Sequence, residues 1–177
     1  MGSARLAHFN KTAKVVSISV TKALAAAGNY AANDVLSESA SSGTAWNFAN
    51  VVGKNGASGK IVRATAVLET TALTPAITLF LFHTVPTSVL NDNVENTAIL
   101  HADVGNYVGR IDFPAMIDLG TGDSESIATE ADGSNIKLPF KCASGDSDLY
   151  GVAVTRDAIT GEVATDDLVI DLLIERD

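Results

Sequence analysis

Residues 60–82 read KIVRATAVLETTALTPAITLFLF and contain two different strand patterns. Over residues 60–70 apolar and polar side chains alternate, which predicts a long strand with one buried face. The buried side is expected to consist of Val62, Ala64, Ala66 and Leu68. Residues 76–82 are apolar at nearly every position, which predicts a strand that is covered on both faces. We expect these two strands to form a central pair on which the rest of the chain packs.

Further strand patterns occur along the whole chain, separated by turns that contain Gly, Asn, Asp and Ser. They cover residues 15–20, 30–36, 46–52, 106–113, 125–130, 136–140, 149–155 and 168–175. Eight to ten strands of this kind predict an all-β fold, an antiparallel β-sandwich. The long crossings between some of them favour a jelly roll over a simple meander.

Two local signals predict how parts of this sandwich connect. The Asn-Gly pair at residues 55–56 is a strong turn signal, so residues 46–52 and 60–70 are expected to pair as an antiparallel hairpin. A pattern that resembles a capping box at residues 92–95 predicts a short helix over residues 94–101. We expect at most one or two short helices in the whole chain.

The totals suit one folded domain, since 46% of the 177 residues are hydrophobic and only 19% are charged. We expect this domain to span residues 15–177, behind a flexible basic N-terminal arm at residues 1–14. No run of about 18 apolar residues occurs, so no membrane span is expected. The N-terminus also lacks a long apolar segment, so a secretory signal is not expected.

The charge of the chain is distributed unevenly along its length. A net charge of −9 argues against general nucleic-acid binding, which requires a basic surface. Residues 1–63 carry a net charge of +5, and residues 64–177 carry −14. A basic front can steer the chain onto an acidic partner, although solvated faces that prevent association would give the same pattern. The candidate contact residues of this basic arm are Arg5, Lys11, Lys14 and Lys22.

No motif in the sequence predicts a catalytic or cofactor-binding site. Residues 53–60, GKNGASGK, resemble a phosphate-binding loop, but the spacing is one residue too long. Ile61 also stands where a Mg²⁺-binding hydroxyl is needed, and a strand follows instead of a helix, so we expect a turn. The histidines are isolated and the acidic pairs lack a calcium-loop order, so no metal site is predicted. These residues are His8, His83, His101, Asp146, Asp148, Asp166 and Asp167.

Two single residues are predicted to belong to the core. Cys142 is the only cysteine, which precludes an intramolecular disulfide. Its neighbours Phe140 and Ala143 indicate a small buried apolar residue rather than a reactive thiol. Trp46 is the only tryptophan and is interpreted as a core residue rather than part of a sugar-binding platform.

Several short motifs follow one another between residues 28 and 175. They are Tyr30-x-x-x-Asp34-Val35, Trp46-x-Phe48-x-Asn50, Ser58-Gly59-x-Ile61, Leu79-x-Leu81-Phe82-x-x-x-Pro86-Thr87, Asp92-Asn93, Tyr107-Val108-Gly109-x-Ile111-x-Phe113 and Leu149-Tyr150-Gly151-Val152. In this order they resemble a group of tailed-bacteriophage proteins encoded among the head genes, often beside the major capsid protein.

The resemblance implies a virion structural protein that decorates or cements the capsid. It would be made in the host cytoplasm, would bind the major capsid protein on the capsid surface, and would form a homo-oligomer, either a dimer or a trimer. It would not be an enzyme and would need no cofactor. One alternative is a head-fibre or receptor-binding β-sandwich that recognises a host-surface glycan. A sandwich-fold hydrolase is a further alternative, for which the sequence offers no catalytic triad.

Overall fold

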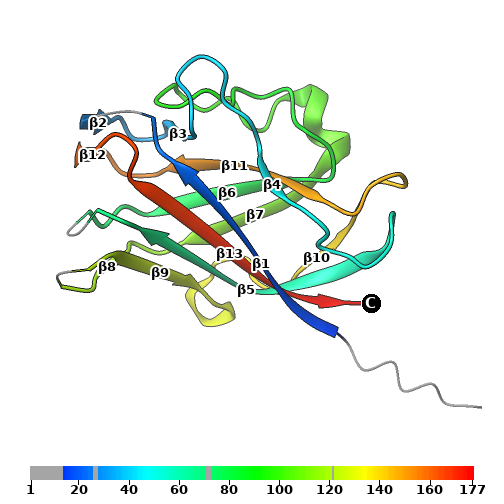
Figure 1. The fold of residues 1–177 in the computed structure, drawn as a ribbon. Helices are drawn as coiled ribbons and strands as arrows, with labels where there is room; N and C mark the ends of the chain where they lie inside the picture. The colour runs from blue at the N-terminus through cyan, green and yellow to red at the C-terminus, as the bar shows by residue number, and fades with distance from the viewer. Residues whose placement is uncertain (1–13, 26–27, 71–72, 121) are drawn as a thin grey trace, which may run out of the picture.

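The computed structural model describes residues 14–25, 28–70, 73–120 and 122–177. Within these residues the chain forms strands and two short 3-10 helices (Figure 1). The elements are β1 Lys14–Ala23, β2 Gly28–Tyr30, β3 Val35–Leu36, β4 Trp46–Phe48, β5 Ser58–Leu68, β6 Ile77–Phe82, η1 His101–Asn106, β7 Tyr107–Phe113, β8 Ile117–Asp118, β9 Ser124–Ala128, η2 Glu130–Asp132, β10 Leu138–Lys141, β11 Leu149–Thr155, β12 Ile159–Glu162 and β13 Asp167–Arg176.

These strands form two antiparallel sheets that pack face to face, which confirms the predicted all-β sandwich (Figure 1). One sheet has the order β1-β13-β5-β9-β8, with β10 also paired to β5. The other has the order β3-β11-β6-β7, with β4 also paired to β11, and β12 pairs separately with β2. The predicted central pair is therefore corrected: β5 and β6 are both central strands, but they belong to different sheets.

The buried side of β5 differs from the prediction at one end. The register with β13 shifts, because Leu173 lies opposite Arg63 whereas Ile174 lies opposite Ile61. This β-bulge leaves Val62 as the extra residue and reverses the alternation there. Ile61 is consequently buried and Val62 is only partly buried, while the remaining predicted core positions of the strand are buried.

The predicted hairpin between residues 46–52 and 60–70 is wrong. The turn at Gly56 exists, with a φ of +70°, but β4 crosses to the other sheet and pairs with β11. Trp46 and Phe48 are both buried there. Gly151 of β11 makes this possible, because a Cβ at that position would lie 3.2 Å from the Trp46 Cβ. The Asn-Gly signal correctly predicted a local turn. The pairing of β4 instead depends on where the Trp46 and Phe48 rings can be buried.

The main core fills the space between the two sheets. It is built from alternate residues of β5, β6, β11 and β13 together with the Trp46 and Phe48 side chains. Cys142 is buried as predicted, and burial is the main reason why the pKa of its thiol is raised to about 11. Such a thiol remains protonated at neutral pH, as expected of a core residue.

Candidate interaction surface

The connection between β6 and β7, residues 83–106, covers the outer face of the five-stranded sheet; we call it the cap. Side chains on this outer face form a second apolar cluster beneath it, with a tilted pair of rings, Phe82 and Tyr107, whose centroids are 5.4 Å apart. The members of this cluster are Val35, Phe80, Phe82, Val152 and Val154, with Val89, Leu90, Ala98 and Tyr107 packed against them. All of β6 is therefore buried, which confirms the prediction of a strand covered on both faces.

The cap is not helical where a helix was predicted. Residues 94–100 have bends, irregular backbone and a single bridge, and the only helix in the cap is η1. Asp92 is buried, and its carboxylate accepts hydrogen bonds from the Tyr30 hydroxyl at 3.0 Å and the Ser37 N–H at 2.7 Å. The Asp92 side chain, which was predicted to begin a helix, instead attaches residues 83–106 to the strands below. This contact is distant in sequence, so the local pattern does not predict it.

A second buried carboxylate, Asp103, holds the two ends of the cap together. It accepts hydrogen bonds from the backbone N–H and the hydroxyl of both Thr87 and Ser88, at 2.9 to 3.2 Å. Burial alone would raise the pKa of Asp103, but these hydrogen bonds outweigh it and lower the pKa below its usual value. The ionised carboxylate therefore stabilises the cap.

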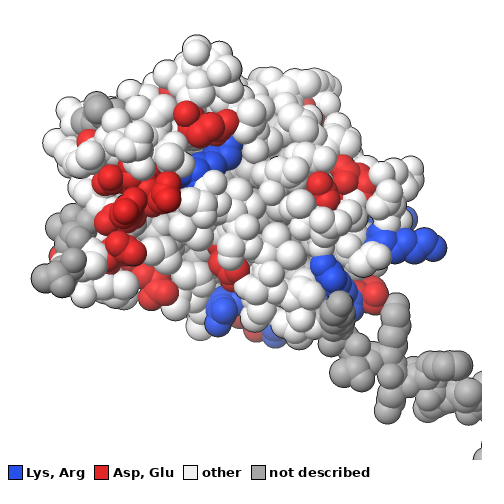
Figure 2. Space-filling view, in the orientation of Figure 1, with Lys and Arg blue, Asp and Glu red and all other residues white. Residues whose placement is uncertain are grey.

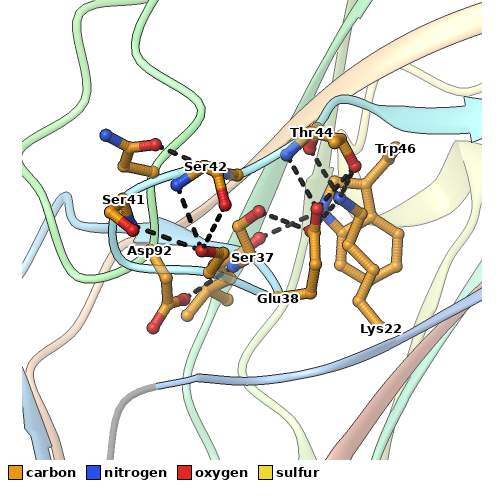
Figure 3. Close-up of polar contacts among 12 residues, drawn as sticks. Lys22, Ser37, Glu38, Ser41, Ser42, Thr44, Trp46 and Asp92 are labelled. Atoms are coloured by element: carbon orange, nitrogen blue, oxygen red, sulfur yellow. Dashed lines mark hydrogen bonds and ion pairs between the residues drawn. The ribbon is translucent and has the colours of Figure 1, made fainter.

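A polar network beside the cap involves the end of β1 (Figure 3). The Lys22 ammonium group donates to the Glu38 carboxylate and to the Thr44 carbonyl, and it lies 5.6 Å from the centre of the Trp46 ring. Burial would raise the pKa of Glu38, but hydrogen bonds from Lys22, Thr44 and Ser37 lower it to about 2. The network therefore fixes residues 37–45 against β1.

The four residues of the predicted contact arm lie in different parts of the chain. Lys22 is buried inside the domain and forms an ion pair with Glu38. We therefore do not propose it as a contact residue. Lys14 is the first residue of β1, at the edge of the described part of the chain. Arg5 and Lys11 lie outside the described residues.

The exposed surface of the cap combines large apolar side chains with polar ones, among them the carboxylate of Glu95. Both of its aspartates are buried, whereas Val85 and Val104 are 54% and 60% exposed. The cap holds half of the large apolar side chains that are exposed in the described parts of the chain: Val85, Val94, Ile99, Leu100 and Val104. Single exposed apolar residues are ordinary, whereas five on one connection make that connection a candidate for an interaction site. Residues 83–106 are thus the candidate interaction surface.

A shallow hollow of about 440 Å³ adjoins the cap. Its lining is formed by Gly43, Thr44, Ala45, Asn47, Val85, Leu90 and Tyr150. The Tyr150 hydroxyl donates to Asp146 at 2.7 Å, which fixes the ring at this border. The hollow extends the apolar surface of the cap and is large enough for a side chain of a bound partner.

Two acidic residues that the sequence offered as candidate metal ligands, Asp146 and Asp166, accept hydrogen bonds within the fold. Asp146 also accepts hydrogen bonds from the N–H groups of Ser147 and Asp148, and Asp166 accepts one from Thr70. Over residues 14–25, 28–70, 73–120 and 122–177, no group of three or more His, Cys, Asp or Glu side chains could hold a metal ion. In the same residues, no helix is long and apolar enough to cross a membrane.

The sequence signal for the cap was weak because its apolar residues follow neither a helical nor a strand period. Burial of Asp92 and Asp103 is decided by contacts that span up to 62 residues of sequence, so it could not be predicted locally. Comparison with known proteins adds no assignment, since neither a protein-family model nor a curated protein matches this chain.

Proposed function

We propose that this protein is a non-enzymatic structural component of a tailed-bacteriophage particle, where it decorates the capsid surface through protein–protein contacts. The observation that carries this proposal is the cap, which exposes several large apolar side chains and is attached by the hydrogen bonds of two buried carboxylates. The motifs that resemble head-gene proteins supply the kind of partner, the major capsid protein.

The order of the strands supports the proposal. The sequences β1-β13-β5-β9 and β3-β11-β6-β7 place strands from the two ends of the chain beside each other in both sheets. We infer a jelly roll from this order, in which two Greek keys are wound together. Viral capsid proteins use this architecture, and so do lectins, so the fold is compatible with the role but does not select it.

The cap suits binding to a large rigid partner. Its backbone is joined to β3 by two hydrogen bonds of 2.9 Å, one from the Asn93 N–H to the Val35 carbonyl and one from the Val35 N–H to the Val94 carbonyl. Asn96 donates in the same way to the Asn33 carbonyl at 2.9 Å. A surface ordered before binding loses little conformational entropy when it docks, so more of the apolar burial contributes to affinity.

The proposal is tested by adding purified protein to particles that lack it. The double variant Leu100→Asp/Val104→Asp places two carboxylates on the cap, and we expect particle affinity to fall by at least about tenfold, or about 1.4 kcal/mol. The matched control is Val163→Asp, since Val163 is 56% exposed but lies outside the cap. Equal binding of wild type and double variant would overturn the proposal, provided that both have the same thermal unfolding.

A further inference from the structure

Glu162 on β12 is a buried carboxylate that the fold leaves almost without hydrogen bonds. It is 3% exposed, and its Oε2 atom has no hydrogen-bond partner among the described residues. Its Oε1 atom lies 3.4 Å from the Thr70 hydroxyl oxygen, which is longer than an ordinary O–H···O hydrogen bond. The single proton of that hydroxyl is donated to Asp166. A carboxylate buried in this way is costly, and a bound cation would compensate it.

The Glu162 side chain is directed to a point where three segments of the chain meet. Thr70 lies just beyond the end of β5, Asp166 lies in the turn between β12 and β13, and the Thr70 hydroxyl contacts both carboxylates. Backbone hydrogen bonds fix this turn, since the Asp166 N–H donates to the Val163 carbonyl at 3.1 Å and the Leu24 N–H donates to the Asp166 carbonyl at 2.9 Å. The fold itself therefore holds the two carboxylates beside one hydroxyl group.

The negative charge at this end of the molecule is not balanced by ion pairs. Among the described residues, no ion pair includes Glu162 or Asp166. Next to Asp166 in the sequence, Asp167 lines a hollow of about 230 Å³ together with Glu69 and Asp123. Figure 2 shows acidic atoms gathered at the end of the molecule where β5 ends and β13 begins. Such a surface attracts cations but defines no site by itself, and the buried Glu162 carboxylate is the separate observation that locates one.

We propose that Glu162, Asp166 and Thr70 form a binding site for a calcium ion. Carboxylate and hydroxyl oxygens are hard ligands, which Ca²⁺ binds at about 2.3–2.6 Å. Two such ligands at right angles around one ion are about 3.4 Å apart. The Thr70 hydroxyl oxygen and the Glu162 Oε1 atom have this spacing. Mg²⁺ is less suited because it requires a strict octahedron, and Zn²⁺ because it favours nitrogen and sulfur ligands.

The affinity of this site is expected to be low. Ca²⁺ takes about six to eight oxygen ligands, more than two carboxylates and a hydroxyl supply. Thr70 and Asp166 are only partly buried, so water can reach the ion from the solvent side. Among the described residues no third acidic side chain completes the group, and sites with few charged ligands have a Kd of about 10⁻⁴ to 10⁻³ M.

A calcium ion at this position would join the end of β5 to the turn between β12 and β13. Thr70 and Glu162 are 92 residues apart in the sequence, which is why no calcium-loop order is visible there. The ion would compensate the buried negative charge, so the folded state would gain stability as the calcium concentration rises. This inference goes beyond the capsid role and does not rest on it.

The test is isothermal titration calorimetry of the full chain with CaCl₂, together with thermal unfolding. At a calcium concentration of about 10 mM we expect Tm to rise by about 3–6 °C, and MgCl₂ at the same ionic strength should have a much smaller effect. Glu162→Gln and Asp166→Asn should each weaken calcium binding by at least about tenfold. Glu175→Gln, at the opposite end of β13, is the matched control and should bind calcium like the wild type.

Glu162→Gln is expected to fold without calcium, because a neutral amide carries no buried charge, so its lost response would not reflect unfolding. The proposal would be overturned if the wild type bound no calcium at about 10 mM, the concentration that nearly saturates a site of this affinity. Binding that Glu162→Gln leaves unchanged would also overturn it, as would an equal rise of Tm with Mg²⁺, which indicates screening of surface charge. The cap variant Leu100→Asp/Val104→Asp should bind calcium like the wild type, and no particle is used, so the two proposals fail independently.

Discussion

The two sheets of this sandwich differ in how far their outer faces are covered. The five-stranded sheet is covered on its outer side by the cap, and every residue of β6 is buried. No described residue covers the outer side of the six-stranded sheet, which we call the bare face, and most of β5 alternates between buried and more exposed positions. A strand that is apolar at every position therefore indicates that another segment covers its outer face. Here that segment is the cap, which directly follows β6 in the sequence.

The two faces also hold their carboxylates differently. In the cap, Asp92 and Asp103 are buried and accept several hydrogen bonds, so Glu95 is its one exposed carboxylate. On the bare face, Glu69 and Asp123 are exposed at one end. We therefore propose the cap, rather than the bare face, as the surface that binds the capsid.

The largest expected effect tests whether β6 is covered on both sides. Phe82→Ala removes a fully buried ring beneath the cap, and we expect it to lower the free energy of unfolding by about 3–5 kcal/mol. Val67→Ala, on the bare side of β5, should cost about 0.5 kcal/mol. Denaturant titration measures both. Similar costs for the two substitutions would remove the distinction between the faces.

The next effect concerns the attachment of the cap. Asp92→Ala leaves the buried Tyr30 hydroxyl and the Ser37 N–H without this acceptor, and we expect a loss of about 2–3 kcal/mol. Hydrogen exchange should accelerate first in residues 83–106. Asp171→Ala is the matched change on the bare face and should leave exchange in the cap unaltered. Uniform acceleration over the whole domain would show that the cap is not a separate unit.

A third prediction concerns a carboxylate that lacks the hydrogen bonds found in the cap. Glu162 is 3% exposed, and its Oε2 atom has no hydrogen-bond partner among the described residues. Burial, helped by the nearby Asp166 charge, raises its pKa to about 7. The folded state therefore holds this proton more tightly than the unfolded chain, so stability falls as pH rises from about 4.5 to about 7.

Glu162→Gln should remove this penalty and stabilise the protein by about 2 kcal/mol at pH 8, with little effect at pH 4.5. Glu125→Gln on the bare face is the control. Thermal unfolding across this pH range measures both variants. The interpretation fails if Glu162→Gln changes stability equally at every pH. Asp103 has the opposite sign: its lowered pKa means that its contribution is lost as the pH falls.

The smallest effect on stability is expected from the N-terminus. β1 begins at Lys14, so removal of residues 1–13 should change the free energy of unfolding by less than about 0.5 kcal/mol. We expect the truncated protein to bind particles more weakly, since it lacks Arg5 and Lys11. Undiminished occupancy of particles by the truncated protein would exclude a contact role for this arm.

Much of the sandwich could be predicted because side-chain alternation is a local property. Residues 168–175 were correctly interpreted as a strand with Leu168, Ile170, Leu172 and Ile174 buried. The partner of β4 could not be predicted, since it depends on Gly151, about 100 residues away. The bulge at Val62 was missed for the same reason, because register is set by the neighbouring strand.

The candidate surface was less predictable than the fold. Residues 92–95 matched a local capping pattern, but the buried Tyr30 hydroxyl and Ser37 N–H require the Asp92 carboxylate, and this requirement prevails over local preference. Lys22 was grouped with the basic arm because sequence shows charge without burial. Its ion pair with Glu38 joins β1 to a separate loop, so it depends on how the strands pack and could not be predicted from the sequence.

The central claim is that the molecule works as a repeated building unit whose cap binds a particle. Quantitative mass spectrometry of purified phage particles tests it most directly, by comparing the copy number of this chain with that of the major capsid protein. A simple fixed ratio between the two, lost in particles that carry Leu100→Asp/Val104→Asp, is the predicted result. Absence of the chain from particles, or a few copies unaffected by the cap variant, would contradict it.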